Sequence, residues 1–257
     1  MTTTKSKYTY VLRTCTEDMM SHDSFQWPRK GKVSCDDWSN ESKCGNGLHG
    51  LLMGYGNGSL LNWDTNAKWL VVKVLTKDIV AIDQDKVKFP KGTVVYCGDR
   101  KGATDYIIAH GAEASKVVGA FITVGNGAMG QGYHYSTVSG GDWSTVNGGE
   151  GSTVSGGNRS TVNGGDYSTV NGGYRSTVSG GYGSTVNGGD WSTVNGGEGS
   201  TVSGGYRSTV SGGIGSILQV KWDDGTRFRI ATAYVGEDGI EANVKYKVNN
   251  QGKFVKV

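Results

Sequence analysis

The chain of 257 residues carries ten consecutive copies of an eight-residue unit, Ser-Thr-Val-(Ser/Asn)-Gly-Gly plus two variable positions, from Ser136 to Gly215. Self-similarity at a short fixed period is typical of a solenoid, in which each unit buries its apolar face only by stacking on its neighbours. Ser-Thr-Val, with two β-branched residues, favours a short strand, and Gly-Gly would supply the positive φ angles of a tight corner. The repeat therefore predicts one strand and one turn per unit.

The eighth position of the unit indicates how many strands make one coil. It is bulky in every odd copy and is glycine in every even copy except the one that ends at Tyr167. The true period is therefore sixteen residues, which predicts a two-sided parallel β-solenoid of about five coils. Because side chains alternate along a strand, the valines should lie inside and the threonines outside.

Composition divides the chain into three predicted segments and makes it mainly β. Residues 1–118 combine strand-like runs with a helical run over 103–116, which predicts an α+β globular domain. Residues 119–217 form the solenoid. Residues 218–257 alternate apolar and polar side chains around turn sequences. They predict a hairpin of strands 219–222 and 226–230 around a turn at 223–225, and further strands at 240–248 and 253–255, and so favour a small antiparallel β cap.

Charge and cysteine content restrict the classes of partner and compartment. The formal net charge is +3, and no segment is basic enough to indicate nucleic acid as a partner. The N-terminus is polar and no long apolar run occurs, so we expect neither a secretory signal nor a membrane partner. Four cysteines without such a signal indicate free thiols and a cytoplasmic protein, in a bacterium or a phage-infected cell, where virion proteins also assemble.

Three motifs stand out in the N-terminal segment: Tyr-Val-Leu-Arg-Thr at 10–14, Cys-Gly-Asn-Gly-Leu-His-Gly at 44–50 and Lys-Val-Lys-Phe-Pro at 86–90. This block, followed by octad repeats, resembles an uncharacterised domain family of bacterial and phage proteins over residues 8–215. The repeats also resemble the β-roll arrays of adhesin heads and phage tail proteins. The resemblance implies an architecture and an origin, and it implies no activity and no cofactor.

Arg13 and His49 are the candidate reactive residues. His49 lies in a glycine-rich loop, where the backbone can approach a ligand closely, and histidine titrates near neutral pH. With Arg13 near the end of the first predicted strand, it resembles the NAD-binding strands of ADP-ribosyltransferase folds, which implies a nucleotide as small-molecule ligand. No glutamate stands in an obvious catalytic motif, and the alternative is a turn whose histidine caps a strand.

Cys35, Cys44 and His49 are the candidate metal ligands. Their spacing, Cys-x8-Cys-x4-His, lacks the Cys-x2-Cys pair that marks a zinc knuckle. Free cysteines are the favoured interpretation, and no metal is expected.

A column of aromatic and basic residues should follow one corner of the solenoid. Its members are Trp143, Arg159, Arg175, Trp191 and Arg207. Neighbouring Trp and Arg side chains about 5 Å apart can stack by cation–π attraction. Such a stripe suits a sugar chain, a single nucleic-acid strand or a protein edge, and the alternative is a ladder that satisfies itself.

A second predicted column consists of outward threonines. They are Thr137, Thr153, Thr169, Thr185 and Thr201. Parallel threonine columns suggest ice binding, although ice-binding solenoids present paired threonine ranks on a flat face and this unit offers one threonine per strand.

The favoured hypothesis is a non-enzymatic phage or bacterial β-solenoid that acts as a structural or binding module through its repeated rigid surface. Its partner would be a second copy of itself or another virion or host protein. One alternative is a nucleotide-binding or ADP-ribosyltransferase-like N-terminal domain on a solenoid scaffold, and another is an ice-binding solenoid.

Overall fold

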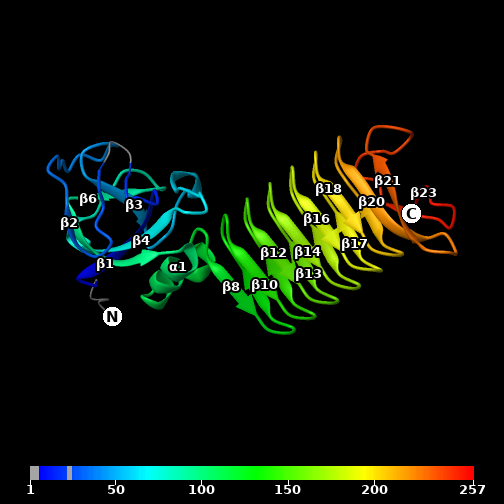
Figure 1. Ribbon diagram of the computed structural model, residues 1–257, viewed down its shortest axis with the longest axis horizontal. Helices are drawn as coiled ribbons and strands as arrows, with labels where there is room; N and C mark the ends of the chain where they lie inside the picture. Colours follow the sequence, from blue (N-terminus) through cyan, green and yellow to red (C-terminus); the bar gives the residue numbers. More distant parts are fainter. Residues whose placement is uncertain (1–5, 22–24) are drawn as a thin grey trace, which may run out of the picture. The chain divides into compact units, whose positions relative to one another are not determined.

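The computed structural model describes residues 6–21 and 25–257. The chain divides into two compact units, Met1–Ala120 and Phe121–Val257, which are described separately (Figure 1).

The first unit is built on a seven-stranded antiparallel sheet of order β2-β7-β4-β1-β3-β6-β5. The strands are β1 (Tyr8–Cys15), β2 (Gly31–Ser34), β3 (Leu48–Leu52), β4 (Lys68–Leu75), β5 (Val80–Ala81), β6 (Val87–Phe89) and β7 (Lys91–Gly98). Short 3-10 helices lie at Gly58–Leu60, Thr76–Asp78 and Ala114–Lys116. The central strands β1 and β4 are apolar on both faces, and Val11, Leu12 and Leu70 are fully buried.

The helix α1 (Arg100–Ala109) contacts β4 and β7, and it is shorter than the predicted run over 103–116. It begins early because the Asp99 carboxylate accepts a hydrogen bond of 2.7 Å from the Gly102 N–H, as an N-cap does. It ends at Ala109 because Gly111 adopts a φ of 102°, which a continuing helix cannot accommodate.

The second unit is a two-sided parallel β-solenoid with sixteen residues per coil, as the sequence predicts. One sheet contains β8 (Phe121–Val124), β10 (Thr137–Gly140), β12 (Thr153–Gly156), β14 (Thr169–Gly172), β16 (Thr185–Gly188), β18 (Thr201–Gly204), β20 (Ile217–Asp223) and β21 (Phe228–Tyr234). The other contains β9 (Met129–Gln131), β11 (Thr145–Asn147), β13 (Thr161–Asn163), β15 (Thr177–Ser179), β17 (Thr193–Asn195), β19 (Thr209–Ser211), β22 (Tyr246–Val248) and β23 (Phe254–Lys256). The solenoid has about six coils rather than five, because β8 and β9 add one before the repeats.

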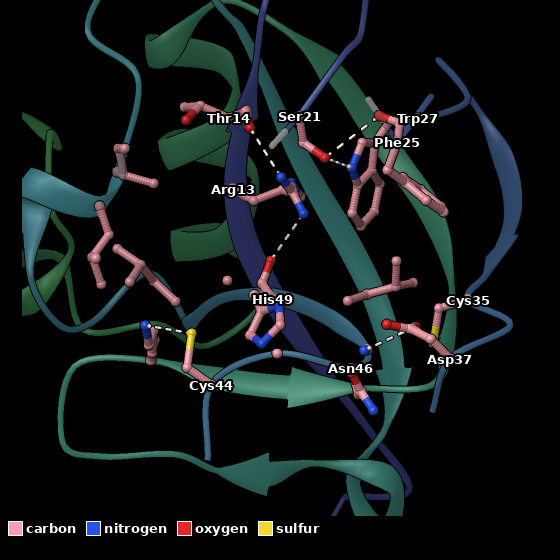
Figure 2. A pocket seen from close by; sticks show the side chains of 18 of the residues that line it. Arg13, Thr14, Ser21, Phe25, Trp27, Cys35, Asp37, Cys44, Asn46 and His49 are labelled. Carbon is pink, nitrogen blue, oxygen red and sulfur yellow. Dashed lines mark hydrogen bonds between the residues drawn. The ribbon is translucent and has the colours of Figure 1, made fainter. Parts of the chain in front are cut away.

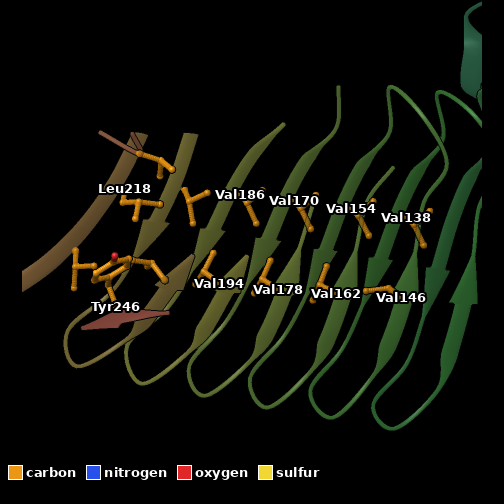
Figure 3. Packing of buried hydrophobic residues seen from close by; sticks show 14 residues of the cluster. Val138, Val146, Val154, Val162, Val170, Val178, Val186, Val194, Leu218 and Tyr246 are labelled. Atoms are coloured by element: carbon orange, nitrogen blue, oxygen red, sulfur yellow. The ribbon is translucent and has the colours of Figure 1, made fainter. Parts of the chain in front are cut away.

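Two stacked columns of valine fill the interior of the solenoid (Figure 3). Each valine pairs with the valine sixteen residues later, as in Val138↔Val154, and every valine from Val138 to Val210 is fully buried. In each unit a buried serine precedes the threonine and valine of the strand. The Ser136 N–H donates to Ser152 Oγ at 3.2 Å, and Ser152 Oγ donates to the Tyr133 carbonyl at 3.1 Å. The same pattern recurs along the stack, so this polar core is satisfied by its own ladder from the second serine onward, whereas the buried Ser136 hydroxyl at its start has no partner among the described residues.

The Gly-Gly pair has a different role from the one that the sequence suggested. None of these glycines within the repeats has a positive φ, and the left-handed residue is the eighth one, such as Arg175 at 56°. The glycines are needed because of close approach instead. A Cβ on Gly172 would lie 2.4 Å from Val178 Cγ2, and one on Gly173 would lie 2.8 Å from the Asn158 nitrogen.

Antiparallel strands close the C-terminal end of the solenoid. β21 pairs with β20, and β22 pairs with β19 through Val210↔Tyr246. Tyr246 is buried against the last valines, and its hydroxyl accepts a hydrogen bond of 2.8 Å from the Glu241 N–H. The strand predicted over 240–248 is reduced to Tyr246–Val248, because Asn243 is left-handed with a φ of 61°.

We expect two neighbouring substitutions at this corner to change the free energy of unfolding by different amounts. Gly172→Ala should lower the free energy of unfolding of the solenoid by about 2 kcal/mol, since its Cβ overpacks the core at Val178. Arg175→Gly should change it by less than about 1 kcal/mol, because glycine relieves the left-handed backbone that arginine strains. Urea unfolding followed by circular dichroism measures both. Equal effects of the two substitutions would contradict this account of the corner.

Candidate functional site

The outward threonines of the first solenoid sheet form one straight rank, here called the odd rank. It comprises Thr137, Thr153, Thr169, Thr185 and Thr201. The strands pair in register, so successive threonines are about 4.8 Å apart. Thr153, Thr169 and Thr185 are exposed, and in the described part of the chain their hydroxyls make no hydrogen bond to protein. The centre of the rank therefore presents free hydroxyls to water.

A second polar rank runs beside the odd rank, two residues further along each strand. Its members are Ser139, Ser155, Asn171, Asn187 and Ser203. These side chains are half-buried, and Asn187 Nδ2 donates to Asn171 Oδ1 at 3.0 Å. Strand alternation places the fourth position of each unit on the same face as the threonine at the second position, so this rank is implicit in the sequence. The face is thus two-ranked, with serine or asparagine as the partner of each threonine.

The opposite sheet carries a similar but less open rank, here called the even rank. It comprises Thr145, Thr161, Thr177, Thr193 and Thr209. Only Thr161 and Thr177 are exposed among these five. The odd rank therefore has the longer uninterrupted exposed run.

The aromatic and basic column is formed as its spacing suggested. Trp143 and Trp191 are 59% and 45% exposed, and both are left-handed at the corner. The Arg159 guanidinium lies 4.5 Å from the Trp143 ring centroid, and that of Arg207 lies 4.9 Å from Trp191. Arg175 lies 5.1 Å from the Tyr174 ring and 5.9 Å from Trp191. The arginine and aromatic side chains of the column thus stack on one another. A binding role for the column stays a prediction.

The first unit contains a cavity of about 760 Å³ that brings together the other candidate residues (Figure 2). Arg13, Cys35, Cys44 and His49 all line it. The Arg13 guanidinium donates to the His49 carbonyl at 3.2 Å and to the Thr14 carbonyl at 3.4 Å. It also lies 3.9 Å from the Trp27 ring centroid. The pair proposed from the sequence is thus in one site, because β1 and β3 are neighbours in the sheet.

Burial controls the ionisation of this cavity. Burial lowers the pKa of Arg13, and the neighbouring Cys15 thiol opposes that shift. Burial also lowers the pKa of His49, helped by the positive charges of Lys86, Arg13 and Lys88, while Asp37 opposes the shift weakly. His49 is therefore a neutral imidazole at neutral pH.

The two cysteines of the cavity form hydrogen bonds within the protein. The described residues contain no group of three His, Cys, Asp or Glu side chains placed to hold a metal ion. Cys35 Sγ instead donates to the Pro90 carbonyl at 3.3 Å, and Cys44 Sγ accepts from Lys86 Nζ at 3.3 Å. No glutamate is among the residues that line the cavity in the part of the chain described.

Comparison with known proteins gives two kinds of match. Residues 9–106 match a family described as a domain of unknown function, DUF7666. The chain is also similar to ice nucleation proteins. It is 39% identical over 104 residues to the one from Pseudomonas fluorescens, covering 40% of this chain and 9% of that protein. It is 36% identical over 114 residues to that of Pseudomonas syringae pv. syringae, covering 44% and 10%, and 38% identical over 101 residues to that of Xanthomonas campestris pv. translucens, covering 39% and 6%.

The chain spans a tenth or less of the length of these curated relatives. No solved structure matches it. The expected resemblance of the N-terminal block to an uncharacterised domain family is confirmed in this coarse form. The likeness to adhesin heads and phage tail proteins finds no support in these matches.

The expectation of a cytoplasmic or virion protein is wrong. The finding that overturns it is the similarity to ice nucleation proteins. Free cysteines and a polar start were the basis of that expectation, and neither determines the compartment. None of the helices in the described residues is long and apolar enough to span a membrane.

The low pKa of His49 predicts a pH-dependent stability. Between the folded pKa and the ordinary value of 6.5, the unfolded chain binds more protons at this residue than the folded chain does. The free energy of unfolding should therefore fall as the pH drops below about 6.5, by less than about 1.4 kcal/mol per pH unit for this one group. Urea unfolding between about pH 7 and 5 measures the slope. His49→Gln should flatten it and His110→Gln, at an exposed site, should not; the reverse would show that another group is responsible.

Proposed function

We propose that the solenoid binds ice through the odd rank and its serine and asparagine partner rank. The observation that carries the proposal is the in-register face on which Thr153, Thr169 and Thr185 present free hydroxyls. Its repeat distances are about 4.8 Å across strands and about 6.8 Å between alternate residues along one strand. Both are similar in size to the spacings between water molecules in an ice lattice plane.

A rigid backbone makes such a face effective. Each strand is held on both sides by the parallel ladder, and the valine and serine columns fix its position from beneath. Threonine side chains are β-branched and stiff at χ1. They therefore lose little conformational entropy when water molecules that bridge neighbouring threonines become ordered. The methyl groups between the hydroxyls limit competing water orientations, which favours a cage-like layer.

The similarity to ice nucleation proteins supports this proposal. We assign the match of about a hundred residues to the repeat region, whose ten units and flanking coils have that length. The odd rank extends over five coils, roughly 24 Å. The matched segment covers a tenth or less of the length of the ice nucleation proteins. Because a larger template stabilises a larger ice embryo, we expect this chain to bind existing ice more effectively than it nucleates new ice.

Partition into ice tests the proposal. Purified full-length protein, frozen slowly from dilute solution, should be enriched in the ice fraction and should inhibit recrystallisation. Thr169→Lys places a long charged side chain at the centre of the odd rank and should remove more than half of both activities, with unfolding unchanged within about 0.5 kcal/mol.

Thr177→Lys is the matched control, because Thr177 occupies the corresponding position in the even rank and is also exposed. It should retain ice activity. Loss with Thr177→Lys alone would assign the function to the opposite face, and exclusion of the unmodified protein from ice would refute ice binding altogether.

A further inference from the structure

The cavity of the first unit holds a half-buried cation, Arg13, that forms no ion pair with a carboxylate of the described residues. Its guanidinium donates to two carbonyl oxygens, lies over the Trp27 ring and interacts with the Cys15 thiol. Burial raises the pKa of Cys15, so this thiol supplies no full counter-charge. A buried charge that lacks a counter-charge is costly, and such charges are ordinarily paired. An anion bound at this point would compensate it.

Two polar atoms in the cavity wall lack hydrogen-bond partners. Arg13 Nε and His49 Nε2 are both shielded from solvent, and within residues 6–21 and 25–257 neither has a partner. Buried donors are nearly always satisfied in folded proteins, so an unsatisfied pair in one cavity indicates a missing acceptor. With the proton on Nε2, the neutral His49 ring donates a hydrogen bond into the same cavity that Arg13 lines.

The other charges at the site are compatible with an anion. Lys86 is half-buried in the wall, and Lys88 is buried close to His49. Asp36 and Asp37 also line the cavity, but both are exposed, and Asp37 Oδ1 already accepts a hydrogen bond of 3.1 Å from the Gly47 N–H. Because exposed carboxylates are screened by solvent, the interior of the cavity is positive.

The rest of the wall is apolar and suits an organic body. Phe25 and Trp27 pack edge to face at 5.4 Å between centroids, and Leu60 and Leu61 lie on another side of the same cavity. A volume of about 760 Å³ lies within the range of sites for small molecules.

We propose that this cavity binds a small organic oxyanion, whose phosphate or carboxylate group accepts hydrogen bonds from Arg13 and His49 while its planar body lies among Phe25 and the leucines. Arginine matches both oxyanions in geometry, so either group satisfies the same donors. This inference concerns the first unit and is independent of ice binding by the solenoid.

Calorimetric titration of the full-length protein tests the site with four probes: adenosine monophosphate, benzoate, inorganic phosphate and adenosine. The first two join an oxyanion to a planar body and at least one of them should bind, whereas adenosine, which lacks the anion, should not. Stronger binding of the nucleotide than of benzoate would identify a phosphate site, and the opposite order a carboxylate site. Equal binding of adenosine and its monophosphate, or no binding of any oxyanion up to about 1 mM, would overturn the proposal.

Substitutions locate the anion. Arg13→Gln should weaken binding by about tenfold or more, as the loss of a charged hydrogen-bond donor requires, and Arg29→Gln, at an exposed arginine of the same unit, should leave it unchanged. If circular dichroism shows that Arg13→Gln does not fold, Arg13→Lys retains the charge but loses the fork of donors and should still weaken binding. Binding that is indifferent to Arg13→Lys and to His49→Gln would refute this placement.

Discussion

The second unit depends on the exact repetition of one contact, the stacking of each residue on its equivalent sixteen positions later. Valine on valine supplies the apolar part of this contact, and serine on serine supplies the polar part. The Ser176 hydroxyl, for example, accepts from the Ser160 N–H and donates to the Gly157 carbonyl of the preceding coil. A core of valine and serine is thin, so cooperativity has to come from the ladder. The same register that stabilises the coil also aligns the threonines on its surface.

The first unit is built differently, around a sheet whose central strands are apolar on both faces, and polar residues line a cavity beside this core. β1 contributes Val11 and Leu12 to the interior, and the next residue along it is Arg13, which forms no ion pair with a carboxylate in the described part of the chain. A stable domain tolerates such an arrangement when a site needs it, because unpaired buried charge concentrates where ligands bind. The cavity at Arg13 and His49 is therefore the part of this unit in which stability and function conflict.

Periodicity determined what could be predicted from the sequence. The sixteen-residue coil, the buried valines and the Trp143 to Arg207 column follow from spacing alone, because each is a property of position within a repeat. The role of Gly-Gly could not be found in this way, since glycine at Gly172 satisfies either a positive φ or a close contact, and only the three-dimensional neighbours distinguish them. The partner rank of Ser155 and Asn171 also follows from strand alternation, because the second and fourth positions of each unit lie on the same face.

The alternation of the units between two sheets has a consequence for how the array can evolve. Loss or duplication of one eight-residue unit would transfer every later unit to the opposite sheet, so that the segment from Ile217 onward would meet the wrong strand and the corner carrying Trp191 would exchange sides. Loss or duplication of sixteen residues preserves all of these relations. The array can therefore lengthen or shorten only by whole coils. Recombination between repeats can change the area of the threonine face in this way without altering its pattern.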